Sequence, residues 1–288
     1  MIGTVVRAAG DDPSWWPAWD LWGDAFLVAL LFGASLPLLG VVLVLRQQMF
    51  VAAAVGQATA FAIAVALQCG LHAHAGGTVP LVAGLAAAVA TSILVLRAMS
   101  ARASTIEARN AWLFLAGGSG AMVVVASSPH GMQEVQRLML SSLVYAGPGD
   151  VLGAGLGLGV VVLLAWTLPR RLAAWAIDPG TAAAHGIDVR AMDVMIGTCL
   201  GLVVGHAMAA TGLAFTFGSM VLPVLCAREL AGSLRGVCLW APAIGASSAL
   251  AGMMLGNRFD LPPGQAAVCV AAAAGPVLRC LRLRRSVQ

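Results

Sequence analysis

Residues 35–67 read SLPLLGVVLVLRQQMFVAAAVGQATAFAIAVAL, and this stretch decides the fold of the chain. Two apolar runs lie on either side of a short polar segment that begins at Arg46. A transmembrane helix needs roughly 20 mainly apolar residues. At their full length the two runs cover residues 24–45 and 50–70, so each is long enough to cross a bilayer. The stretch therefore predicts two membrane-spanning helices with a tight connection.

The composition of the whole chain agrees with this interpretation. Of the 288 residues, 60% are hydrophobic and only 10% are charged, whereas soluble domains carry about 25% charged residues. We therefore interpret the chain as an integral membrane protein in contact with lipid. The net charge of +4 does not indicate a nucleic-acid partner, because the arginines lie between apolar runs. The six cysteines, without a CxxC motif, are interpreted as small apolar residues.

The remaining apolar runs predict the fold class, an all-α, polytopic membrane helical bundle of about nine transmembrane helices. The side with more arginine is expected to face the cytoplasm. If the N-terminus is outside, thirteen arginines face inward and three face outward, and nine spans place the C-terminus inside. The predicted spans are residues 24–45, 50–70, 79–97, 111–128, 149–168, 191–210, 212–227, 236–256 and 265–280.

The chain is predicted to have three parts. Residues 1–23 form an N-terminal interfacial segment, because DDPSWWPAWDLWGD carries four tryptophans of the kind that gather at membrane surfaces. Residues 24–280 form the transmembrane domain, and residues 281–288 form a basic cytoplasmic tail.

Three segments together resemble one family, the permease subunits of zinc/manganese-type metal ABC importers. Residues 35–67 resemble the family's arginine-terminated helix followed by M-x-F and G-D-A-L-S-H-A. IDPGTAAAHGID, residues 177–188, is similar to its F-D-P-x-x-A-x-x-x-G-I/V segment. Residues 211–268 resemble its V-G-x-L-L-x-x-A-L-L-x-x-P-A-x-x-A run and the L-D-x-P-x-G-x-x-I/V that follows. The resemblance covers about residues 24–280, which would be the permease domain.

The resemblance implies the permease subunit of an ATP-driven importer in the bacterial inner (cytoplasmic) membrane. The expected cargo is a divalent metal ion, namely zinc, manganese or iron, delivered by an extracytoplasmic metal-binding protein. A second permease subunit, in a homo- or heterodimer, and a cytoplasmic ABC ATPase subunit are the other expected partners. The chain has no G-x-x-x-x-G-K-[ST] loop, so ATP is expected on the ATPase subunit and no cofactor is expected on this chain.

Residues 169–190, PRRLAAWAIDPGTAAAHGIDVR, form the longest charged loop on the predicted inner side. Asp178 followed by Pro179 is typical of a helix start, and Gly186 is typical of a helix end. The resemblance implies that this segment couples the permease to the ATPase, with His185 either part of that interface or solvated rather than a metal ligand. The alternative is an ordinary capped loop between two spans.

The expected ion path departs from the family pattern. The aspartate and histidine of G-D-A-L-S-H-A are four residues apart, so they share one helix face and suit zinc or manganese. Aligned on Phe50, the chain has Ala53 at the aspartate and Gln57 at the histidine. Two interpretations of Gln57 remain open, a path residue at the family's histidine position or an amide that packs between helices.

Other candidate ligands are few. His206 lies within a predicted span, where ionisable residues are rare and often functional; it either lines the path or is satisfied by a neighbouring carbonyl or serine. His72 and His74 form an H-x-H pair that could meet a metal at the outer mouth. Asp193 is expected at the inner edge of its span, where interfacial water solvates it.

Two other functions remain as alternatives. The same ABC architecture could carry a metal chelate or another small solute that needs no ionic ligand in the path. A different class would be a non-ABC membrane partner protein or a secondary transporter. An enzyme is not expected, because the chain lacks paired carboxylates, HExxH and a nucleophile elbow, and no catalytic residue is assigned.

Overall fold

The computed structural model describes residues 19–69, 78–97, 103–126 and 143–286. These residues are mostly helical, with no β-strand among them, which agrees with the predicted all-α class. The helices are α2 (Trp19–Leu45), α3 (Phe50–Gln68), α4 (Thr78–Arg97), α5 (Ala103–Ala126), the 3₁₀ turn η3 (Leu143–Tyr145), α7 (Pro148–Thr167), α8 (Pro169–Ile177), α9 (Pro179–Ala184), α10 (Val189–Thr211), α11 (Leu213–Leu230), α12 (Leu234–Phe259) and α13 (Pro263–Ser286).

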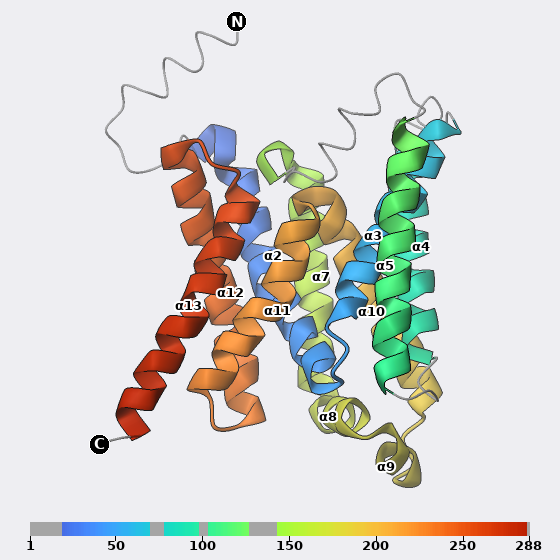
Figure 1. Ribbon diagram of the computed structural model, residues 1–288, viewed down its shortest axis with the longest axis vertical. Helices are drawn as coiled ribbons and strands as arrows, with labels where there is room; N and C mark the ends of the chain where they lie inside the picture. The colour runs from blue at the N-terminus through green and yellow to red at the C-terminus, as the bar shows by residue number, and fades with distance from the viewer. Residues whose placement is uncertain (1–18, 70–77, 98–102, 127–142, 287–288) are drawn as a thin grey trace, which may run out of the picture.

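The long helices run up and down between two ends of a bundle (Figure 1). One group contains α2, α11, α12 and α13, and a second group contains α3, α4, α5 and α10. Helix α7 lies between them and packs on both α2 and α10. The short helices α8 and α9 lie at the lower end in Figure 1, which we call the α8–α9 end. We call the other end of the bundle the opposite end.

Six helices of the described chain are long and apolar enough to cross a membrane: α2, α3, α7, α10, α11 and α12. Helices α4, α5 and α13 run beside them. Each of the nine predicted spans overlaps one of these nine helices. The structure therefore contains the predicted helices, while the nine membrane crossings and the orientation of the termini stay predictions.

Two details bear on the predicted parts of the chain. The interruption expected between residues 210 and 212 is a break at Gly212, whose φ of 81° lies in the region that favours glycine. Helix α13 continues to Ser286, so it runs on into the segment interpreted as a tail. Most of residues 1–23 lies outside the described residues.

Small residues bring helix backbones together. A methyl group at Gly245 of α12 would overlap the carbonyl oxygen of Gly33 in α2. A methyl group at Gly252 would overlap the backbone of Ala267 in α13. Such close approach is how helices pack tightly in membranes, where lipid is as apolar as the side chains. Larger side chains would therefore not fit where α12 packs on α2 and on α13.

Candidate functional site

The turn between α8 and α9 has the cap geometry expected from its sequence. Asp178 is the N-cap of α9, and its Oδ1 accepts a hydrogen bond from the Gly180 N–H at 2.9 Å. The Thr181 hydroxyl donates to the other carboxylate oxygen. Pro179 occupies the first helical position, where a missing N–H costs nothing. The bond from the Thr181 hydroxyl, followed by those from the Thr181 and Gly180 backbone, holds the pKa of Asp178 below its ordinary value.

Helix α9 ends as sharply as it begins. The N–H of Ile187 donates to the Ala182 carbonyl at 3.1 Å, and the N–H of Gly186 donates to the Ala183 carbonyl at 3.0 Å. Gly186 has a φ of 77°, so this is a glycine-terminated Schellman end. His185 lies at the surface with its Nδ1 2.8 Å from the Thr181 carbonyl oxygen. The four predicted coupling residues therefore form one compact, exposed, capped turn.

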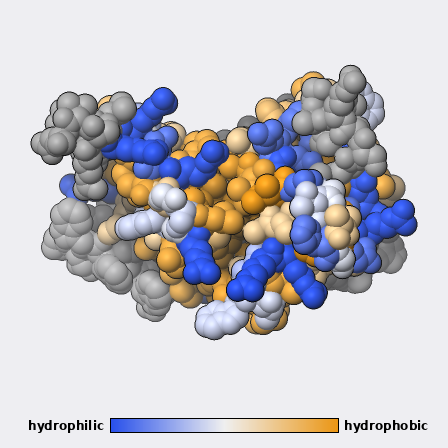
Figure 2. Space-filling model, turned by 90° about the horizontal axis from the view of Figure 1, so that it is seen from below, coloured by the Kyte–Doolittle hydropathy of each residue, from blue (hydrophilic) through white to orange (hydrophobic). Residues whose placement is uncertain are grey.

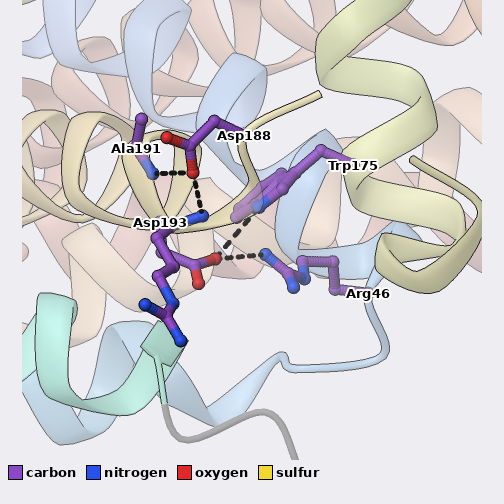
Figure 3. A network of polar contacts seen from close by, with 6 residues as sticks. Arg46, Trp175, Asp188, Ala191 and Asp193 are labelled. Carbon is purple, nitrogen blue, oxygen red and sulfur yellow. Dashed lines mark hydrogen bonds and ion pairs between the residues drawn. The ribbon is translucent and has the colours of Figure 1, made fainter. Parts of the chain in front are cut away.

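A buried network anchors α8 to the bundle (Figure 3). The Trp175 indole N–H of α8 donates to Asp193 Oδ1 at 3.0 Å. Arg46 Nη1 lies 3.6 Å from the same oxygen. The Arg46 guanidinium also stacks over the Trp175 ring, 3.6 Å from its centroid. We call these three residues the anchor network, and it joins the end of α2, helix α8 and the first turns of α10.

The anchor network corrects the expectation for Asp193. Interfacial solvation was expected, but Asp193 is only 5% exposed, Arg46 is 8% exposed and Trp175 is fully buried. A buried charge is stable only with a partner and further hydrogen bonds, and here the guanidinium and the indole supply them. The prediction was wrong because no single span shows that Arg46 reaches it from α2. The network holds α8 firmly while α9 projects outward.

An open groove with a volume of about 430 Å³ lies beside α8 and α9. Its walls come from the two short helices and the turn that follows them, and they include Arg170, Ala174, Ile177, Thr181, His185 and Ile187. Ile177 is 66% exposed on this groove. Seen from the α8–α9 end, hydrophilic side chains surround an apolar surface (Figure 2). This end therefore offers apolar side chains within a charged border.

Gln57 is buried between α3 and α5. It is 3% exposed on α3, and its side chain packs against Gly117 and Gly118 of α5. A methyl group at Gly118 would lie 3.0 Å from Gln57 Oε1. That oxygen has no hydrogen-bond partner among the described residues. Ala53, one turn earlier, is also buried. In this chain, Gln57 is thus part of the contact between α3 and α5.

His206 points from α10 toward α7 and α2. Its Nε2 lies 3.8 Å from Asp150 Oδ1, and its ring lies 5.7 Å from that of Phe32. A methyl group at Gly153 would overlap the imidazole. The sequence interpretation did not include Asp150. The signal in the sequence was an acidic residue in the first turn of a predicted span, but only the packing of α7 on α10 makes it a neighbour of His206.

The remaining predicted ligands are the histidine pair of the outer mouth. His72 and His74 lie outside the described residues. Among the residues that the structure does describe, no three His, Cys, Asp or Glu side chains form a group able to hold a metal. Two polar features therefore stand out, the anchor network at one end and the Asp150–His206 pair toward the other.

Comparisons with known proteins place this arrangement in a family. Residues 19–277 match the ABC 3 transport family. The chain is 22% identical over 251 residues to the manganese import system permease protein ScaB of Streptococcus gordonii, covering 86% of this chain and 87% of that protein. It resembles a chain of PsaBC from Streptococcus pneumoniae in complex with Fab, with a TM-score of 0.74, 17% identity, and coverage of 96% and 95%.

A second solved structure is an inward-facing conformation of a metal-chelate type ABC transporter. Its TM-score is 0.71 at 17% identity, with coverage of 88% of this chain and 84% of that chain. At these identities the two structures support the fold, and the family match over residues 19–277 supports membership. The chain belongs to the ABC 3 transport family.

Proposed function

We propose that the chain is the permease subunit of an ATP-driven importer of a divalent metal ion in the bacterial inner membrane. The observation that carries the proposal is the capped α8–α9 turn, exposed on one side and fixed to the bundle by the anchor network on the other. Family membership supports a transport subunit. In this proposal the α8–α9 end faces the cytoplasm, and an external metal-binding protein meets the opposite end.

The groove beside α8 and α9 is the proposed contact with the ATPase. Exposed Ile177 offers an apolar contact, and Arg170 lies on the rim. Caps at both ends bind the terminal backbone groups of this short helix, which limits its fraying at the surface. Such a turn can enter a cleft of the ATPase, and a movement of the ATPase would then displace α8.

We propose that the anchor network passes this displacement of α8 on to the transmembrane helices. Trp175 moves with α8, and it contacts Arg46 and Asp193 directly. Arg46 precedes α3 by only a few residues, and Asp193 belongs to the first turns of α10. Movement of α8 would therefore reach α2, α3 and α10 through side chains that touch one another.

A second permease subunit, identical or homologous, is proposed to pack on the outward face of α7. Leu152, Leu156 and Leu163 are at least 60% exposed on this helix. A methyl group at Gly155 or Gly159 would meet nothing within 4 Å, so a partner helix can approach these positions closely. Two such helices would place Asp150 beside the interface of the two subunits.

For the cargo, we propose manganese or a similar ion, following the name of the Streptococcus gordonii relative. A metal chelate is the second candidate, because Ala53 and Gln57 provide no ionisable ligand at the family's positions. One structural neighbour is described as an ABC transporter of the metal-chelate type.

The test is uptake by proteoliposomes that hold the permease, its ATPase and the external binding protein. We expect ATP-dependent accumulation of radioactive manganese, and none without ATP. Uptake of a chelate with no uptake of manganese, zinc or iron would replace the first cargo by the second. An ATPase that fails to bind the permease would contradict the proposal as a whole.

A further inference from the structure

Asp150 and His206 meet across a gap that no hydrogen bond closes. The distance from Asp150 Oδ1 to His206 Nε2 is 3.8 Å, which is too long for a hydrogen bond. His206 Nε2 makes no hydrogen bond to any described residue. The Asp150 side chain is 34% exposed and that of His206 is 17% exposed, so the gap is shielded but not fully enclosed by the chain.

Both side chains are held in place. The Gly147 N–H donates to Asp150 Oδ2 at 3.1 Å, which turns Oδ1 toward His206. The imidazole lies in the space left by Gly153 and beside the Phe32 ring. Groups that orient a ligand from behind are typical of metal sites, where they fix the donor atom.

The size of the gap suits a metal ion. Nitrogen and oxygen ligands bind zinc at roughly 2.1 Å each, so one ion can bridge donor atoms up to about 4.2 Å apart. The observed 3.8 Å lies below this limit, which holds for a linear arrangement, and above the roughly 3.4 Å of tetrahedral ligands, so a small rotation of either side chain completes the geometry. An imidazole and a carboxylate are also ligands suited to first-row divalent metals.

The geometry points to Asp150 and His206 as a binding site with two protein ligands for a divalent metal ion, near the opposite end of the bundle. Water completes the coordination, so the ion is held weakly and can leave. This inference rests on the proposed transport of metal ions, and it assigns the metal contact to α7 and α10 in place of residues 53 and 57 on α3. A plain ion pair between imidazolium and carboxylate is the competing explanation.

Metal binding by the purified permease–ATPase complex tests the inference, with cobalt(II) absorption as the readout. Asp150→Asn keeps the shape and the bond to Gly147, and His206→Ala removes the other donor. We expect each variant to bind the ion at least about tenfold more weakly, because even groups behind metal ligands change affinity by 10–100-fold. Asp24→Asn is the matched control and should bind as the wild type does.

Unchanged cobalt affinity in both Asp150→Asn and His206→Ala would overturn the inference, and size-exclusion profiles identify a variant that fails to fold. Asp150→Glu, which keeps the charge, should restore part of the affinity. Uptake assays separate the two proposals. If the wild type takes up metal and both variants take up as much, only the metal site at Asp150 and His206 is contradicted. If the complex binds metal but shows no ATP-dependent uptake, only the proposed function is contradicted.

Discussion

The anchor network and the Asp150–His206 pair are both polar groups among apolar helices. They differ in whether their polar atoms bond to one another and are buried. In the anchor network, Asp193 Oδ1 accepts from Trp175 and faces Arg46, and all three side chains are buried. In the pair, the two donor atoms remain 3.8 Å apart and partly exposed. A closed network holds helices together, while an open pair keeps donor atoms available to a ligand. Substitutions in and around the two groups should reveal this difference.

The largest effect is expected from Asp193→Ala. It leaves the Arg46 charge buried without its carboxylate, which costs about 3–5 kcal/mol of stability. Thermal unfolding of the purified complex measures the change. Glu229→Ala is the control, because Glu229 pairs with exposed Arg282 at 3.1 Å and such surface pairs contribute about 0–1 kcal/mol. Equal losses of stability in Asp193→Ala and Glu229→Ala would show that the anchor network contributes no more than an exposed ion pair.

Trp175→Phe is expected to have the next largest effect. The ring under Arg46 remains, but the hydrogen bond to a carboxylate is lost, and such bonds contribute about 1.5–3 kcal/mol. Metal uptake per ATP hydrolysed should fall, because α8 is held less firmly. Trp112→Phe, at a 67% exposed position on α5, serves as the control. Unchanged coupling in Trp175→Phe would remove the network from the transmission route.

Gln57→Leu separates the two interpretations of Gln57 with a small change in stability. The carbonyl oxygen is buried without a partner among the described residues, so its replacement by an apolar group of similar size should cost less than about 1 kcal/mol. Uptake should be retained if the residue only packs against α5. A strong loss of uptake at wild-type stability would restore the path interpretation. Gln68→Leu, at the exposed end of α3, is the control.

The smallest effect concerns Asp178 and pH. Because its pKa in the folded protein is lowered from 3.8, its charge stabilises the turn at pH values above the ordinary carboxyl range. That contribution is lost as the pH falls through the lowered pKa. Asp178→Asn keeps a good cap without the charge. Its unfolding temperature should therefore lie slightly below wild type at pH 7 and converge with it in acid. A gap that widens in acid would contradict the assignment.

Local structure could be predicted from the sequence more fully than contacts between helices. Apolar length alone predicted the helices, and Asp178, Pro179 and Gly186 predicted the capped turn, since caps depend on neighbouring residues. The direction in which Gln57 points could not be predicted. Its helix is apolar on all sides, so periodicity does not distinguish the face toward α5 from any other.

The two polar sites required tertiary structure. Arg46 and Asp193 are far apart in the chain, and each alone resembles an interfacial charge. Asp150 and His206 lie on different helices that meet only because α7 packs on α10. Gly153, whose missing side chain leaves space for the imidazole, has no distinguishing mark among the glycines of its helix.

The contact between Gly33 and Gly245 has a mechanical consequence. With backbone against backbone, the only side chains that α2 and α12 bring to this contact are the small, rigid ones of Pro37 and Ala249, which cannot rearrange while one helix slides past the other. Gly252 joins α12 to α13 in the same way. These three helices should therefore move as one rigid body during a transport cycle. The displacement that opens and closes the protein must then occur where larger side chains separate the helices.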